Sequence, residues 1–523
     1  MDRPLHPCHH AASRPDATAM VVADTGETLS YAELDAASNR FAQAMRAAGL
    51  RPGDRLGVML RNGLLFAQVY WGAQRSGLMP VLLQAHLSAD EAAWILDDCR
   101  AKALLVAGSL GPTPHALAAD RGVIPDVTHL FAADDTPLPG SISLTEAMAA
   151  QPAEPVADEI SGFHMLYSSG TTGRPKGVAM PFEPGPIDRI GTSEGSTRLY
   201  EAFDPLVSFN AGPLFHGAPL NAMLLTQRLG GTFVTLAKFD AEATLAAIER
   251  YKVNHAQFVP TMFVRLLALP KETRAKYDLS SLRFVLHAAA PCPVEIKRRM
   301  IEWLGPIVHE YYASTEGVGA TFITAQEWLE RPGSVGKSSL GPIHICDEAG
   351  AELPAGDAGQ IWFEAPPGRF VRYLNDPAKT RAATHPEHVN WFTVGDIGRL
   401  DEGGYLYLTD RKDFMIISGG VNIYPQAVED CLIVHPAVLD VAVIGVPHSD
   451  YGEQVLAIVQ PKHADADRSG LEADLRAWCA TRISPVTAPR LYRFVDDLPR
   501  LASGKLAKHA LRAQFALLEG TDR

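Results

Sequence analysis

One stretch of the chain combines the residue types that bind phosphate groups. Residues 167–177 read Tyr-Ser-Ser-Gly-Thr-Thr-Gly-Arg-Pro-Lys-Gly, and the run Phe163–Tyr167 that leads into them is typical of a strand. Glycines let backbone N–H groups approach an oxyanion closely, hydroxyls add donors, and Lys176 can neutralise phosphate charge. We therefore expect a phosphate-binding loop rather than a flexible surface loop. It is not a Walker A loop, because the pattern G-x-x-x-x-G-K-[ST] cannot be fitted to it.

A second segment imitates a nucleotide-binding motif. Residues 333–338, Gly-Ser-Val-Gly-Lys-Ser, end like a Walker A loop. Arg331 stands where that loop requires its first glycine. We reject this segment as a nucleotide site and expect a turn there.

Four further segments follow the phosphate-binding loop in order. They are Pro-Leu-Phe-His-Gly at 213–217, Tyr-Ala-Ser-Thr-Glu-Gly at 312–317, Gly395-Asp396 with Asp410-Arg411, and Leu-Pro-Arg at 498–500 leading to Ser-Gly-Lys at 503–505. Together the five segments resemble the adenylate-forming superfamily, which includes acyl-CoA synthetases, aryl-CoA ligases, luciferases and peptide-synthetase adenylation domains. The resemblance runs from about residue 25 to residue 513.

The resemblance implies an ATP-dependent acid–CoA ligase that works in two steps. Mg-ATP adenylates a carboxylic acid and releases pyrophosphate, and the coenzyme A thiol then attacks the acyl-AMP to give acyl-CoA and AMP. The implied cofactors and co-substrates are thus ATP, Mg²⁺ and coenzyme A. Mg²⁺ is a hard cation that suits oxygen ligands and substrate phosphates.

Matched positions of the family imply a nucleotide site. The cradle for the β- and γ-phosphates consists of Ser168, Ser169, Gly170, Thr171, Thr172 and Lys176. The adenine and ribose contacts are Ala289 and Ala290 through their backbone, Tyr312 by stacking, and Asp396 and Arg411 on the ribose hydroxyls. Thr315 is implied to donate to the α-phosphate, and Glu316 to coordinate Mg²⁺.

The resemblance also implies the catalytic groups. Adenylation is an in-line attack of one anion on another, so the ammonium of Lys505 can bridge the substrate carboxylate and the α-phosphate and lower the barrier electrostatically. His216 resembles a residue at the mouth of the acyl site that changes position between the two steps.

Thioester formation requires a second arrangement of the site. In the family, a small C-terminal domain rotates about a hinge, and Asp413 matches the hinge position. Gly419 and Gly420 resemble the loop that lines the pantetheine tunnel, and Lys238 aligns with a lysine near the CoA phosphates.

The elements that must position these residues can be traced locally. Ser30 and Glu33 have capping-box spacing before a helical apolar pattern that Gly49 ends, and Ser88 and Glu91 repeat the signal. Strands are expected at Leu56–Leu60, Ala103–Val106 and Val438–Val446, and helices at 425–434 and 471–482. Residues 107–160 are rich in Pro, Ala and Asp and predict a looser surface region.

These patterns predict an α/β protein of two domains. We expect residues 1–412 to form a large N-terminal domain with parallel-rich sheets flanked by helices, which the resemblance makes the AMP-binding domain. Residues 413–523 are expected to form a small α+β C-terminal domain, which the resemblance implies is mobile and carries the catalytic lysine.

Composition limits the partners and the compartment. The 523 residues carry a formal net charge of −13, which argues against nucleic acid as a partner. No apolar window is long enough to span a membrane, and the six cysteines contain no CxxC pair, so we expect reduced thiols in the cytoplasm. At the N-terminus, His6, Cys8, His9 and His10 could suggest a metal site, but we expect a frayed end there. The sequence favours neither a monomer nor a homodimer.

The acid and the acyl acceptor are open at this stage. Apolar residues dominate 214–225 and 257–267, which favours a fatty acid over a cinnamate- or benzoate-type acid or a polycyclic acid. Side-chain volume at His287 and Tyr311 predicts a narrowed acyl pocket, and Thr487 stands where many relatives carry a lysine near CoA. One alternative is an adenylating enzyme that transfers the acyl group to a carrier protein or into an oxidative reaction. Another is a non-catalytic nucleotide-binding or scaffolding protein.

Overall fold

The structure is a computed structural model. It describes residues 5–168, 175–179, 184–189, 194–366, 372–463, 467–500 and 505–516, with the backbone alone at 168, 194–196 and 410–412. The chain divides into two compact units. The first consists of Met1–Phe258, Ala268–Leu286 and Val371–Thr380, and the second of Val259–Leu267, His287–Phe370 and Arg381–Arg523.

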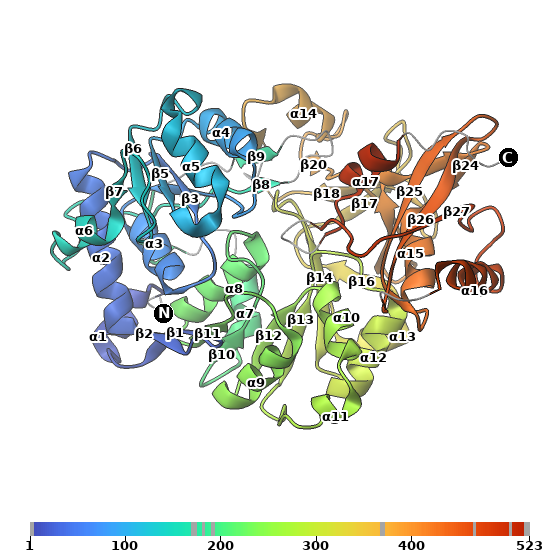
Figure 1. The fold of residues 1–523 in the computed structure, drawn as a ribbon, viewed down its shortest axis with the longest axis horizontal. Helices are drawn as coiled ribbons and strands as arrows, with labels where there is room; N and C mark the ends of the chain where they lie inside the picture. The colour runs from blue at the N-terminus through green and yellow to red at the C-terminus, as the bar shows by residue number, and fades with distance from the viewer. Residues whose placement is uncertain are drawn as a thin grey trace. The chain divides into compact units, whose positions relative to one another are not determined.

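The first unit contains a parallel five-stranded sheet of order β4-β3-β5-β6-β7, of which Figure 1 labels β3, β5, β6 and β7. Its strands are β3 (Arg55–Met59), β4 (Met79–Leu82), β5 (Ala103–Val106), β6 (His129–Ala132) and β7 (Ile142–Ser143). Its helices are α2 (Tyr31–Ala47), α3 (Leu64–Arg75), α4 (Ala89–Asp98), α5 (Pro112–Ala119) and α6 (Leu144–Ala149). Helix α2 packs against α3 and α6, and α4 packs against α5. Strands β3 and β5 are buried almost throughout, as expected for parallel strands covered by helices.

A second sheet of this unit has the order β13-β12-β10-β11-β1-β2, and its pairs β10–β11, β10–β12 and β1–β11 are parallel. Its strands are β1 (Thr18–Val22), β2 (Glu27–Ser30), β10 (Val207–Phe209), β11 (Thr232–Thr235), β12 (His255–Phe258) and β13 (Phe284–His287). The helices between them are α7 (Glu194–Glu201), α8 (Gly217–Arg228), α9 (Ala241–Tyr251) and α11 (Lys271–Arg274). A small antiparallel sheet of β8 (Tyr167–Ser168), β9 (Lys176–Ala179) and β19 (Arg372–Tyr373) completes the unit.

Local signals predict the first helices correctly, whereas composition gives a wrong prediction for residues 107–160. Both capping boxes are present, with the Ser30 and Ser88 hydroxyls accepting from the N–H of the residue three positions on. The expectation of a looser surface region at 107–160 is wrong, because α5, β6, β7 and α6 lie there. Leu117, Leu130 and Leu144 bury their side chains in these elements, so a few apolar anchors outweigh the Pro and Asp around them.

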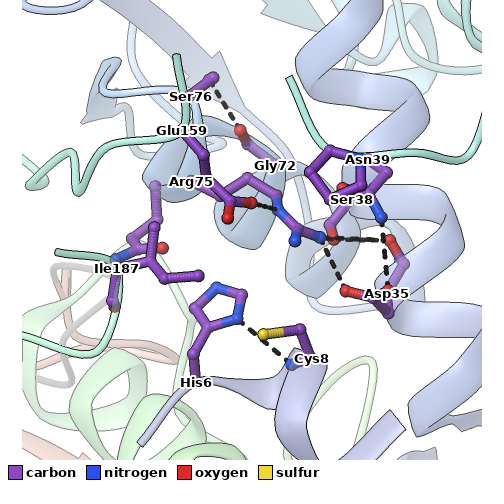
Figure 2. A network of polar contacts seen from close by, with 12 residues as sticks. His6, Cys8, Asp35, Ser38, Asn39, Gly72, Arg75, Ser76, Glu159 and Ile187 are labelled. Carbon is purple, nitrogen blue, oxygen red and sulfur yellow. Dashed lines mark hydrogen bonds and ion pairs between the residues drawn. The ribbon is translucent and has the colours of Figure 1, made fainter. Parts of the chain in front are cut away.

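The N-terminal end is also more ordered than predicted. Residues Pro7–Ser13 form helix α1, which packs on α2, so the expected fraying is wrong from residue 5 onward. The Leu5 N–H donates to Asp188 Oδ1 at 2.8 Å, and His9 Nε2 lies 3.0 Å from the same oxygen. Figure 2 shows His6 and Cys8 of this segment close to the buried Arg75. Within the described residues, no group of three or more His, Cys, Asp or Glu side chains could hold a metal ion.

The second unit is built on an antiparallel sheet of order β17-β18-β21-β22-β16-β15-β14, with β20 paired to β18. Its strands are β14 (Val308–Ala313), β15 (Ala320–Ile323), β16 (Ser334–Ser338), β17 (Ile343–Cys346), β18 (Gly359–Glu364), β20 (Trp391–Phe392), β21 (Asp396–Leu400) and β22 (Leu406–Arg411). Helices α10 (Pro260–Ala268), α12 (Val294–Leu304) and α13 (Ala325–Glu330) belong to this part, and α14 spans Pro377–Ala382.

The turn predicted at residues 333–338 is wrong, because this segment is strand β16. It pairs with β15 on one side and β22 on the other, which keeps the backbone extended. Gly336 has φ +97°, and a Cβ there would lie 2.1 Å from the Phe322 carbonyl oxygen. The glycine thus serves close strand packing, in agreement with the rejection of a nucleotide site here.

The C-terminal part of the second unit has its own sheet of order β24-β23-β26-β25, with β27 beside β26. Its strands are β23 (Ile416–Ser418), β24 (Val421–Ile423), β25 (Val438–His448), β26 (Gly452–Pro461) and β27 (Leu491–Phe494), and its helices are α15 (Pro425–Ile433), α16 (Arg468–Ala480) and α17 (Lys508–Phe515). The helices and the strand predicted from periodicity in this region are confirmed to within a few residues. In the part of the chain that the structure describes, every helix is too short or too polar to cross a membrane.

Candidate active site

The base of the predicted phosphate loop is a hairpin in the first unit. Strands β8 and β9 place Ser168 opposite Lys176. The prediction of a strand at Phe163–Tyr167 is largely wrong, because β8 begins only at Tyr167. Among the residues 163–166, only Met165 forms a bridge, an isolated one to Val81. Ser169, Gly170, Thr171 and Thr172 lie outside the described residues.

A polar anchor fixes the start of this hairpin. The Tyr167 hydroxyl donates to Asp98 Oδ2 at 2.6 Å, and Asn375 Nδ2 donates to Asp98 Oδ1 at 3.0 Å. Burial raises the pKa of the Tyr167 phenol, and the contact with Asp98 raises it further, so the hydroxyl stays protonated as the donor. Sequence reasoning missed Asp98, which stands at the end of α4 and far from the loop in sequence.

The predicted adenine segment follows β13 and belongs to the second unit. Ala288 is buried, whereas Ala289 is exposed and has φ +77°, a left-handed conformation that is unusual for alanine. Ala290 is half-buried. A backbone turn of this shape can present N–H and C=O groups to a flat base.

The residues predicted to bind the ribose are brought together. The Tyr312 hydroxyl donates to Asp396 Oδ2 at 2.5 Å, and Asp396 is only 8% exposed. In the β21–β22 ladder, Asp396 lies directly opposite Arg411, whose backbone alone is described. Directly opposed residues of antiparallel strands have Cβ atoms about 5 Å apart, which suits joint contact with one sugar.

Thr315 and Glu316 follow the end of β14. The Gly317 N–H donates to the Ser314 carbonyl at 3.1 Å, which makes a turn that carries Thr315 at its exposed side. Glu316 is half-buried. A single carboxylate fits Mg²⁺, because this ion is usually held by one or two carboxylates, substrate phosphates and water rather than by a protein cage.

Lys505 stands just before α17, and the residues that follow it pair with Pro499 and Arg500. Arg500 and Leu506 form an antiparallel bridge, and the Ala507 N–H donates to the Pro499 carbonyl at 2.9 Å. The Arg500 guanidinium holds Asp440 of β25 through Nε at 2.7 Å and Nη2 at 2.5 Å. The described residues on the two sides of 501–504 are therefore held together.

Asp413 and the two glycines lie close to the start of the C-terminal sheet. Arg512 of α17 donates to the Asp413 carbonyl at 3.0 Å. Gly419 and Gly420 have φ +57° and +80° and connect β23 to β24 as a two-residue hairpin. Positive φ at both positions is what a type I′ turn requires, so the backbone alone gives a reason for both glycines.

His216 and Lys238 belong to the first unit. His216 is the N-cap residue of α8, with its ring beside Phe215 at 4.8 Å between centroids. Lys238 is exposed in the connection from β11 to α9. Tyr311 is half-buried on β14, and the predicted narrowing of the acyl pocket stays a prediction.

Two protein families match this chain. The family described as AMP-binding enzyme matches residues 8–374, and the AMP-binding enzyme C-terminal domain matches residues 427–505. The chain belongs to the AMP-binding enzyme family.

Curated relatives of this AMP-binding enzyme are CoA ligases of different acids. Feruloyl-CoA synthase of an Amycolatopsis species is 33% identical over 97% of this chain and 98% of the relative. The long-chain-fatty-acid–CoA ligase FadD13 of Mycobacterium tuberculosis is 29% identical over 97% of each chain. The predicted superfamily and the class of AMP-forming acid–CoA ligase are thereby confirmed.

Solved structures agree with the fold. The o-succinylbenzoate CoA synthetase of Bacillus subtilis, in complex with its acyl-adenylate, has a TM-score of 0.79 and 26% identity over 98% of both chains. ATP-bound MatB of Rhodopseudomonas palustris has a TM-score of 0.79 and 29% identity over 98% of this chain and 100% of that one. The predicted α/β fold is confirmed. The boundary at residue 413 and the roles of individual residues stay predictions.

Proposed function

We propose that this AMP-binding enzyme activates a carboxylic acid with ATP and transfers the acyl group to coenzyme A. The observation that carries the proposal is the convergence of Tyr312 and Asp396, two residues 84 positions apart in sequence, with Arg411 opposite Asp396. Curated relatives over nearly the whole chain support the same chemistry.

The adenylation step needs positive charge at two anions. Lys505 bridges the substrate carboxylate and the α-phosphate, and a contact of this kind contributes roughly 10²–10³ in rate. Thr315 donates to the same phosphate. Lys176 and the hydroxyls of the 168–172 loop hold the other two phosphates, and Glu316 holds Mg²⁺, which neutralises phosphate charge.

Transfer to CoA uses the C-terminal part of the chain. Residues 1–412 act as the adenylation body and 413–523 as a mobile domain that turns about Asp413. The hairpin of Gly419 and Gly420 then lines the path of pantetheine, Lys238 contacts the CoA phosphates, and His216 gates the acyl site. We place the enzyme in the cytoplasm, where its six free thiols would stay reduced.

The acid has a large apolar body, either a fatty chain or an aryl group. Relatives of both kinds support this range, since feruloyl-CoA synthase and FadD13 both align over 97% of the chain. A fatty acid is our first candidate, because α8 and α10 contribute buried apolar side chains in the segments expected to form the acyl wall.

The test is pyrophosphate release from purified enzyme with Mg-ATP and a panel of fatty acids of increasing length, cinnamates and benzoates, each with and without CoA. We expect release with at least one acid, and CoA thioester only when CoA is present. Pyrophosphate without thioester would favour transfer to a carrier protein. No release with any acid would refute adenylation.

A further inference from the structure

A charged cluster is buried beneath the predicted adenine segment. Lys297 Nζ lies 2.6 Å from Glu310 Oε2, and the two side chains are 0% and 7% exposed. His287 Nε2 lies 3.5 Å from the same carboxylate oxygen. The Lys297 ammonium also sits 4.8 Å from the ring centroid of Trp328. Among the described residues, neither ring nitrogen of His287 makes a hydrogen bond.

Stability alone explains such a cluster poorly. Burial lowers the pKa of Lys297 and raises the pKa of Glu310, in each case against the attraction of the partner. Burial, and then the charge of Lys297, lowers the pKa of His287 far below its ordinary value, so this ring is neutral. Apolar residues of similar volume often replace a buried ion pair without loss of stability, so the pair calls for another role.

The cluster joins the elements on both sides of the adenine turn. His287 ends β13 immediately before Ala288, and Lys297 lies in α12, which begins three residues after Pro291. Glu310 lies in β14 two residues before Tyr312, so both side chains leave the strand on the same face. The turn at 288–293 therefore lies between His287, whose ring approaches the Glu310 carboxylate, and α12, whose Lys297 pairs with that carboxylate.

The turn itself is strained. Ala289 has φ +77°, and a left-handed conformation costs a residue with a Cβ about 1–2 kcal/mol. Such strain persists only where the surrounding structure fixes it, and it gathers at ligand sites. The Lys297–Glu310 pair is a buried contact between the helix that follows this turn and the strand that carries Tyr312.

We propose that Lys297 and Glu310 are positioning residues for ATP, holding the adenine turn and the Tyr312 strand at the separation that one adenine ring requires. The inference rests on the proposed function, because it assumes that the nucleotide binds between these elements. Neither residue touches the reacting atoms, so the pair acts on nucleotide affinity rather than on the chemical step.

The test compares Glu310→Gln with a matched variant in the other unit. Gln keeps the shape but leaves the Lys297 cation without a counter-charge. The control is Asp35→Asn. The guanidinium of the buried Arg75 lies 2.7 Å from the Asp35 carboxylate and 2.7 Å from that of Glu159, and this substitution neutralises the first of them (Figure 2). For each variant we would measure the thermal midpoint and the KM values for ATP and for the acid. Titration calorimetry gives the ATP dissociation constant.

We expect Glu310→Gln to raise the ATP dissociation constant and the KM for ATP about tenfold, with the KM for the acid within twofold of wild type. Asp35→Asn should lower the thermal midpoint and leave both KM values unchanged. A lower midpoint with wild-type ATP binding in Glu310→Gln would overturn the proposal.

A second variant covers the case in which Glu310→Gln does not fold. The double substitution Lys297→Met with Glu310→Leu refills the volume without charge. If ATP affinity stays weakened in this stable protein, filling the volume does not replace the Lys297–Glu310 ion pair, as we propose. If wild-type affinity returns, the pair is only a packing element and the proposal fails. Wild-type enzyme that does not bind ATP at all would instead refute the proposed function.

Discussion

Acidification should destabilise the segment that leads into the phosphate loop, through His164. This imidazole is buried just before β8, with Nδ1 2.8 Å from the Tyr70 hydroxyl and its ring stacked on Phe163 at 4.5 Å between centroids. Burial lowers the pKa of His164 to about 4. The folded protein therefore keeps this ring neutral at pH values where an unfolded chain would protonate it.

The sign and size of the effect follow from linkage. The unfolded histidine has a pKa of about 6.5, so between about pH 6.5 and pH 4 the unfolded state binds a proton that the folded state does not. The free energy of unfolding is highest above pH 6.5 and falls as the pH drops. At pH 5 the loss from this residue is about 2 kcal/mol relative to pH 7.

Urea unfolding at pH 7 and pH 5, followed by circular dichroism, measures this loss. We expect the free energy of unfolding of His164→Gln to fall between the two pH values by about 2 kcal/mol less than that of wild type. His115→Gln, a change at an exposed histidine of α5, is the control and should keep the wild-type loss. Burial also lowers the pKa values of His6, His287 and His309, so the variant keeps the part of the acid loss that these three histidines cause. Equal losses in wild type and His164→Gln would refute the reasoning.

Four further outcomes test the site. Lys505→Ala should reduce pyrophosphate release by roughly 10²–10³ yet spare thioester formation from supplied acyl-adenylate, and equal loss of both would contradict its role. Tyr312→Phe keeps the ring and removes the donor to Asp396, so KM for ATP should rise about tenfold while kcat stays within a few fold. Ala289→Gly relieves a positive φ and should raise the free energy of unfolding by about 0.5–1 kcal/mol in urea titrations. Gly420→Asn tolerates the left-handed turn but fills open space beside it, so adenylation should persist while thioester formation falls; normal thioester rates would argue against a tunnel there.

Sequence predicts the elements that local contacts decide. The capping boxes at Ser30 and Ser88 are complete within three residues, and Ala103–Val106 forms β5 with the predicted bounds, because its uninterrupted apolar run suits a buried parallel strand. The conformation of residues 333–338 depends on two partner strands, neither of which the local pattern shows, and the prediction of a turn failed there.

In the candidate site too, the sequence predicts some features and misses others. Residue types identify Tyr312 and Asp396 one by one, but only the fold shows that they meet. Lys297 and Glu310 escaped notice because each reads as an ordinary charge. One signal was available: Lys297 falls on the apolar stripe of α12 beside Ile296 and Met300, where a charged side chain needs a buried partner.

Residue identity and backbone conformation give different kinds of evidence about this site. At Gly419 and Gly420 the two agree, because a type I′ hairpin asks for glycine, so their presence does not by itself point to a ligand. At Ala289 they disagree, since alanine opposes the φ that it adopts. A conformation that its own residue disfavours must be imposed by neighbours, and residues of the charged cluster precede and follow that turn in the chain. The structural case for a ligand site is therefore stronger at the alanine than at the glycines.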